Sequence, residues 1–74
     1  MEFDYSKLLG KITEVYRTQS RFSKDMGLSE RSVSMKLNGC RKWKQDEMAR
    51  ACELLHIPLS EIPLYFFTVK VQCY

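Results

Sequence analysis

Residues 18–39 read TQSRFSKDMGLSERSVSMKLNG, and this stretch decides the fold. Apolar residues recur at helical spacing on both sides of a central glycine: Phe22, Met26, Leu28, Val33 and Leu37. Gly27 can adopt the left-handed backbone conformation that a tight turn needs. Thr18 and Ser29 each stand where the first residue of a helix would be capped by a side-chain oxygen. The stretch therefore predicts two short helices, residues 19–26 and a second one that ends at Asn38, packed across a turn.

Positive charge is concentrated in the same part of the chain. Residues 17–44 contain eight basic and two acidic residues, a net charge of +6, whereas the rest of the chain has four basic and seven acidic residues, a net charge of −3. The overall formal charge of +3 conceals this asymmetry. Two packed helices, a turn glycine, a polar outer face and local cations together predict a helix-turn-helix, whose second helix can enter the major groove of DNA.

Helical periodicity outside this stretch predicts three further helices, at about residues 4–16, 45–56 and 60–66. Pro63 falls within the first turn of the last one, where its missing N–H does little harm. Trp43 stands alone in the basic loop CRKWKQ, and we expect it to pack over the small core rather than to stack on a base. The predicted fold class is mainly α, with five helices in one small domain.

The C-terminal residues 67–74, FTVKVQCY, change to a period of two. Phe67, Val69 and Val71 fall on one side, which predicts a short β-strand. No other segment has a convincing strand pattern, and a lone strand leaves its backbone groups unpaired. We therefore expect two chains to pair this strand across a two-fold axis; the alternative is a frayed or docked tail. The expected division is a helix-turn-helix domain at residues 1–67 and a strand or tail at 68–74, a candidate dimerisation element.

Several classes of protein are disfavoured by composition. No apolar run approaches the roughly 20 residues that cross a bilayer, and the N-terminal residues MEFDYSK do not resemble a signal peptide, so we expect a cytoplasmic protein with no membrane partner. The three cysteines form no CxxC pair and His56 is the only histidine, so neither a metal site nor a cofactor is expected. Without a nucleophile beside that imidazole or a glycine loop for phosphates, we expect no catalytic residues and no enzyme.

The stretch at 18–39, continued by RKW and by DEMARACELL, resembles the phage repressor and Cro family of five-helix, lambda-repressor-like DNA-binding domains over about residues 5–66. The string SVSMKLNGCRKW looks especially like small Cro-type regulators of phages from Gram-positive bacteria. The family often has an apolar residue where this chain has Lys36, and we expect Leu37 to take the inward role.

This resemblance implies a sequence-specific regulator of transcription that binds double-stranded DNA. Most simply it would be a Cro-like repressor that binds a palindromic operator as a homodimer, associated with the nucleoid in a bacterial host cell. The alternative is an antirepressor or antitoxin that binds another protein, such as a partner repressor. In that case the face of the recognition helix would contact protein.

The resemblance also implies roles for individual residues on the outer face. Those expected to contact bases are Ser29, Glu30, Arg31, Ser34, Met35 and Asn38. Those expected to contact phosphates are Gln19, Ser20, Arg21, Lys36, Arg41, Lys42 and Lys44. Those expected at the dimer interface are Phe67, Val69 and Val71.

Overall fold

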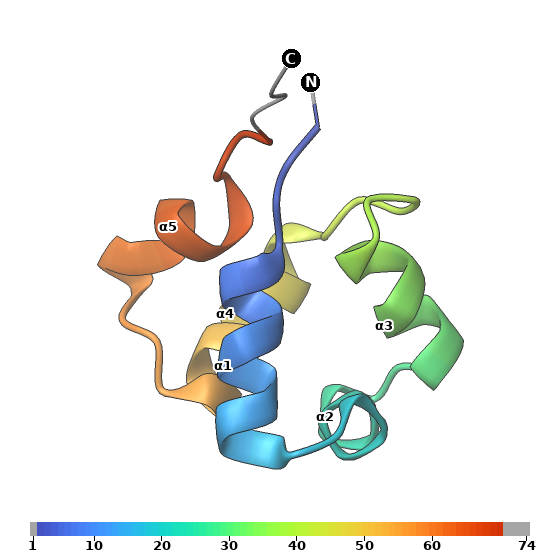
Figure 1. Ribbon diagram of the computed structural model, residues 1–74. Coiled ribbons are helices and arrows are strands. Elements are labelled where there is room, and N and C mark those ends of the chain that lie inside the picture. The colour runs from blue at the N-terminus through green and yellow to red at the C-terminus, as the bar shows by residue number, and fades with distance from the viewer. Residues whose placement is uncertain (1, 71–74) are drawn as a thin grey trace.

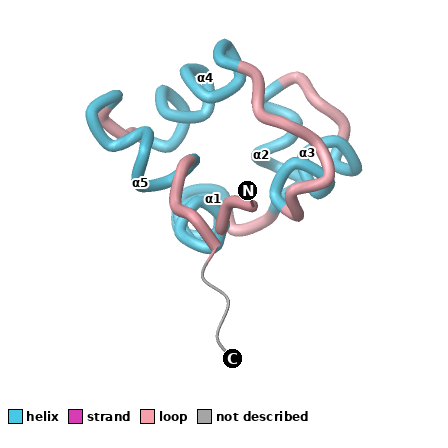
Figure 2. Tube along the Cα trace, turned by 90° about the horizontal axis from the view of Figure 1, so that it is seen from above, coloured by secondary structure: helices cyan, strands magenta, loops and turns pink. Residues whose placement is uncertain are grey.

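Five α-helices make up most of residues 2–70, the part of the chain that the computed structural model describes. They are α1 (Ser6–Tyr16), α2 (Gln19–Met26), α3 (Glu30–Leu37), α4 (Gln45–Leu55) and α5 (Ile62–Phe66), with a 3-10 turn, η1 (Leu59–Glu61), before α5. Figures 1 and 2 both show α2 and α3 side by side, with α5 on the opposite side of the molecule. The predicted five-helix, mainly α fold is confirmed.

The core receives apolar side chains from every helix. The residues that are almost fully buried are Leu8, Ile12, Phe22, Val33, Ala51, Cys52, Leu55 and Phe66. Trp43 closes this core from the loop between α3 and α4: it is 8% exposed, and its ring meets that of Phe66 edge-on at a centroid distance of 5.3 Å. The expectation that Trp43 packs over the core is confirmed. A core this small stabilises the fold only modestly, so single contacts outside it carry weight.

The helix pair α2–α3 follows its local signals closely. Thr18 Oγ1 accepts a hydrogen bond from the Arg21 N–H at 3.2 Å, and Ser29 Oγ accepts one from the Ser32 N–H at 3.1 Å. Gly27 has a φ of +74°, the left-handed conformation that ends α2 and redirects the chain into α3. The first helix begins at Ser6, two residues later than predicted, because Asp4 Oδ1 accepts from the Ser6 N–H at 2.8 Å and holds the preceding residues out of the helix.

The two ends of the described chain are joined. Phe3 and Val69 form an isolated antiparallel β-bridge, flanked by hydrogen bonds from Asp4 N–H to Thr68 O (2.7 Å) and from Lys70 N–H to Glu2 O (2.9 Å). The Phe3 and Phe67 rings meet edge-on at 5.7 Å. We call this pairing of residues 2–4 with 68–70 the terminal bridge; both segments leave the helices on the same side in Figure 1.

The terminal bridge corrects the prediction for the C-terminal segment. Up to Lys70 there is one bridge residue, Val69, rather than a strand, and its partner is Phe3 of the same chain. The extended residues before α1 supply this partner, and their sequence, EFDY at residues 2–5, alternates polar and aromatic side chains, a strand signal that the prediction overlooked. The argument that residues 68–70 need a second chain therefore no longer applies. Self-association stays a prediction, and Val71, with the rest of 71–74, lies outside the described residues.

Candidate functional site

The outer surface of α3 is the candidate site, and its N-terminal end is open to a partner. Glu30 and Arg31 are exposed, and within residues 2–70 neither side chain forms an ion pair or hydrogen bond. Ser29 is exposed too, although its hydroxyl is used as the helix cap. Ser20 and Arg21, at the start of α2, are exposed, and Gln19 is half-buried. The residues predicted to contact DNA at the N-terminal end of α3 and the start of α2 are therefore accessible, and their roles stay predictions.

The C-terminal end of α3 is engaged with the protein itself. The Asn38 amide Nδ2 donates to Ser34 O at 2.9 Å, so it holds the end of its own helix. Arg41 Nη1 donates to Ser32 Oγ at 3.1 Å, which ties the following loop to α3. Ser34 and Met35 are both half-buried. The predicted contacts at this end thus have less freedom to reach a base edge than those at the other end.

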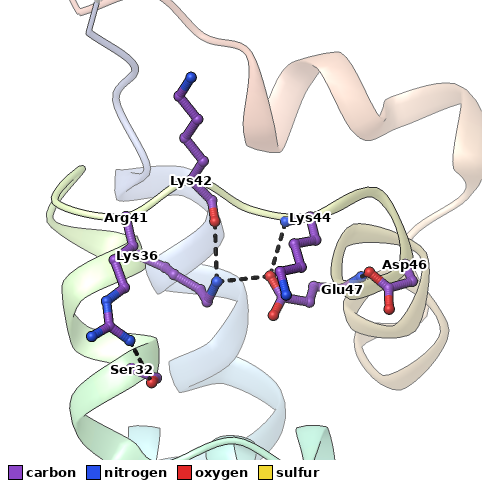
Figure 3. Close-up of polar contacts among 7 residues, drawn as sticks. All are labelled: Ser32, Lys36, Arg41, Lys42, Lys44, Asp46 and Glu47. Carbon is purple, nitrogen blue, oxygen red and sulfur yellow. Dashed lines mark hydrogen bonds and ion pairs between the residues drawn. The ribbon is translucent and has the colours of Figure 1, made fainter.

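Lys36 does not face outward as the predicted phosphate contact requires. It is 6% exposed, and its Nζ lies 2.8 Å from Glu47 Oε1 and donates to Lys42 O at 3.0 Å (Figure 3). It also lies 6.0 Å from the centre of the Trp43 ring. Lys36 takes a core-facing position at the end of α3 because Glu47 enters from α4 to neutralise it. We call Lys36, Glu47 and the Lys42 carbonyl the Lys36 cluster.

The Lys36 cluster fastens the loop between α3 and α4. Burial disfavours the charged form of Glu47, but the hydrogen bonds from Lys36 Nζ and from the Lys44 N–H (2.9 Å) outweigh it and hold the pKa of this carboxyl below its ordinary value. The amides of Cys40 and Arg41 donate to Met35 O at 2.8 and 3.3 Å. The loop is therefore held at both ends, while the Lys42 side chain extends away from the cluster in Figure 3.

A hollow of about 330 Å³ adjoins the outer face of α3, and acidic and basic residues from the termini line it together with polar residues of α2 and α3. Gln19, Ser34 and Asn38, all predicted DNA contacts, share this hollow with Asp4 and Lys70. Hydrogen bonds from the hydroxyl and the backbone N–H of Ser6 hold the pKa of Asp4 below its ordinary value, so the Asp4 carboxylate is charged at neutral pH. Sequence reasoning missed Asp4 and Lys70, because nothing in the sequence indicates that the two terminal segments pair with each other.

The described part of the chain contains neither a candidate membrane-spanning helix nor a candidate metal site. None of the helices in residues 2–70 is long and apolar enough to cross a membrane. Among the same residues, no group of three or more histidine, cysteine, aspartate or glutamate side chains is placed to hold a metal ion.

Comparison with known proteins finds similarity over almost all of the chain. A family model described as "Protein of unknown function (DUF739)" matches residues 1–69. The solution structure of the modulator of repression (MOR) of the temperate bacteriophage TP901-1 from Lactococcus lactis is similar, with 53% sequence identity and a TM-score of 0.79. That match covers 97% of this chain and 97% of the other. No curated protein matches the chain.

These findings overturn the expectation that the chain is a Cro-type regulator. The matching family is not described as Cro-type, and the similar structure is that of a different kind of phage protein, a modulator of repression. The resemblance rests on the stretch at 18–39 with RKW and DEMARACELL, whose apolar residues and turn glycine mainly specify how the helices pack. A shared fold does not specify the function of a protein. The function depends on which side chains on the outer face of α3 are available to bind a partner.

Proposed function

The chain belongs to the DUF739 family, and we propose that it modulates repression in a phage by binding a partner regulatory protein, without catalysis. One observation carries the proposal: 53% identity to a phage modulator of repression over 97% of both chains. Similarity that extends over the whole length includes the surface as well as the core. It therefore supports a shared role more strongly than a shared fold alone would.

The charges around α3 support a protein partner. A duplex presents phosphates along both edges of its grooves, so a protein that lays α3 in a groove brings neighbouring side chains close to them. Here Asp4 lines the same hollow as Ser34 and Asn38, and Glu2 is exposed on the same segment. Carboxylates beside the helix repel phosphates, whereas basic side chains of a protein partner can pair with them.

A second proposal, sequence-specific binding of double-stranded DNA, is favoured by the open end of α3. Arg31 and Arg21 are exposed there, and an arginine can hydrogen-bond guanine through two nitrogens. The segment from residue 17 to 44 keeps its net charge of +6, although Lys36 within it is paired with Glu47. The experiment below separates the two proposals.

The purified chain is titrated into the DNA-binding domain of the repressor encoded by the same phage, and separately into duplexes from the intergenic region and of random sequence. Calorimetry should show a saturable complex with the repressor domain, with a Kd of about 1 μM or tighter. The two duplexes should bind equally weakly. No complex with the repressor domain, together with preferential binding of the intergenic duplex, would replace the first proposal by the second.

A further inference from the structure

A second hollow, of about 210 Å³, lies where the loop between α3 and α4 meets both ends of the chain. Phe3 and Tyr5 are among the residues that line it. Its charged lining residues are Glu2, Arg41, Lys42 and Lys70, three cations and one carboxylate, which leave a net charge of +2. We call it the Lys42 hollow.

The two residues that bring cations from the loop are fixed by hydrogen bonds to α3. The Lys42 carbonyl accepts from buried Lys36, and Arg41 is bonded to Ser32 through one of its guanidinium nitrogens. The backbone amide of Arg41 also donates to Met35 O. Charges on a preorganised backbone bind with a smaller loss of conformational entropy than charges on a mobile loop.

The third cation reaches the Lys42 hollow from the other end of the sequence. The Lys70 N–H donates to Glu2 O at 2.9 Å, so the terminal bridge holds the base of the Lys70 side chain beside the α3–α4 loop. Two separately fastened segments thus place like charges around one hollow. Like charges that are brought together without a counter-ion lower stability, so an arrangement that retains them favours an anionic ligand.

The described chain balances these cations only in part, because Glu2 is the one carboxylate among the lining residues and three cations face it. In residues 2–70 the ion pairs are Lys11–Glu14, Lys36–Glu47 and Arg50–Glu53, and none of them includes a cation of the hollow. We infer that the Lys42 hollow receives the carboxylate of an aspartate or glutamate side chain from the partner protein. This inference rests on the proposed function and specifies the chemistry of the partner at one point.

The geometry favours a carboxylate over a DNA phosphate. A hollow with aromatic walls admits a single side chain that projects from a protein surface, whereas duplex phosphates are fixed in rows along a convex backbone. Asp4 lines the 330 Å³ hollow beside α3, so a duplex that contacts α3 would bring phosphates close to its carboxylate. Lys70 lines both this hollow and the Lys42 hollow. A protein partner can place an acid over Lys42 and a base over Asp4, which a run of phosphates cannot do.

The test compares two double variants with the same change of net charge. Lys42→Glu with Lys70→Glu reverses two cations of the hollow, and Lys7→Glu with Lys24→Glu reverses two exposed cations that do not line it. Binding to the repressor domain is measured by calorimetry at two salt concentrations. The hollow variant should weaken binding about 30-fold and the control less than about threefold, because only the former breaks a direct charge pair.

A neutral double variant, Lys42→Met with Lys70→Met, guards against misfolding of the charge-reversed protein, and it should weaken binding about tenfold. Equal effects of the hollow and control variants, with intact wild-type binding, would overturn the inference and leave the proposed function standing. A larger loss on a DNA duplex than on the repressor domain would assign the hollow to phosphate and overturn it as well.

A titration with hexaglutamate, followed by ¹⁵N NMR, tests the hollow without the repressor. The Gly39, Lys42 and Lys70 amides should shift more than those of Lys7 and Lys24. Shifts spread evenly over all five would overturn the inference even if the repressor binds, whereas failure of the repressor alone to bind would contradict the proposed function.

Discussion

The two ends of α3 carry similar residues and use them in opposite ways. At the N-terminal end, Glu30 and Arg31 are exposed, and their side chains form no ion pair or hydrogen bond within residues 2–70. At the C-terminal end, Lys36 is buried against Glu47, and Arg41 in the following loop is bonded to Ser32. A basic residue on a predicted recognition helix is therefore no evidence of a ligand until its own protein contacts are known. The difference has measurable consequences for stability.

The largest effect is expected at Lys36. Lys36→Met keeps the aliphatic stem but leaves the Glu47 carboxylate without its cation, so the free energy of unfolding should fall by about 3 kcal/mol. Arg31→Met, the matched change at the open end, should alter it by less than about 0.5 kcal/mol. Urea denaturation at neutral pH measures both. Similar values for the two variants would mean that the two ends of the helix do not differ as described.

A smaller effect is expected from pH, through Glu47. Its pKa is lower in the folded chain than in the unfolded one, so its stabilisation is present above the unfolded pKa and is lost as the pH falls through the folded pKa. At neutral pH, Glu47→Gln should lower the free energy of unfolding by about 2 kcal/mol. This difference from the wild type should shrink towards zero between about pH 6 and pH 3. Urea denaturation across that range measures it, and a difference that stays constant would exclude an ionised Glu47 as the cause.

The smallest effect is expected at the cap of α3. Ser29→Ala removes the acceptor for the Ser32 N–H and should lower the free energy of unfolding by about 1 kcal/mol, or Tm by about 4–8 °C. Ser20→Ala, an exposed position just inside α2, is the control and should change Tm little. A thermal melt followed by circular dichroism compares them. If Ser29→Ala were as harmful as Lys36→Met, the open end of α3 would be held by contacts that the structure does not contain.

The helix boundaries were predictable because their signals are local. Thr18, Gly27 and Ser29 each act within three residues of their own position, and the bounds of α2 agree with the prediction. The burial of Lys36 depends on Glu47, which lies 11 positions away on another helix. One clue existed: the repressor and Cro family often has an apolar residue at this position. We expected Leu37 to face the core in place of Lys36 and therefore did not expect Lys36 to be buried. In the structure Leu37 is only half-buried.

The terminal bridge could not be predicted from periodicity. Val69 and Phe3 both lie in alternating segments, but alternation does not indicate which segments pair, and pairing across nearly the whole chain leaves no local pattern. The hollows that contain Asp4 and Lys70 were missed for the same reason. The main functional prediction, a Cro-like repressor, was wrong, and its alternative, a regulator that binds another protein, agrees better with the similar structure. The basic segment could not separate the two because it suits DNA and protein partners alike.

The terminal bridge also orders events during synthesis of the protein. Residues 2–4 leave the ribosome first, yet their partners at 68–70 are added several seconds later at about 5–20 residues per second. The core needs Phe66, which is added only four positions before Lys70, so the core and the terminal bridge are completed within about one second of each other. Synthesis must therefore have reached residue 70 before the Lys42 hollow exists.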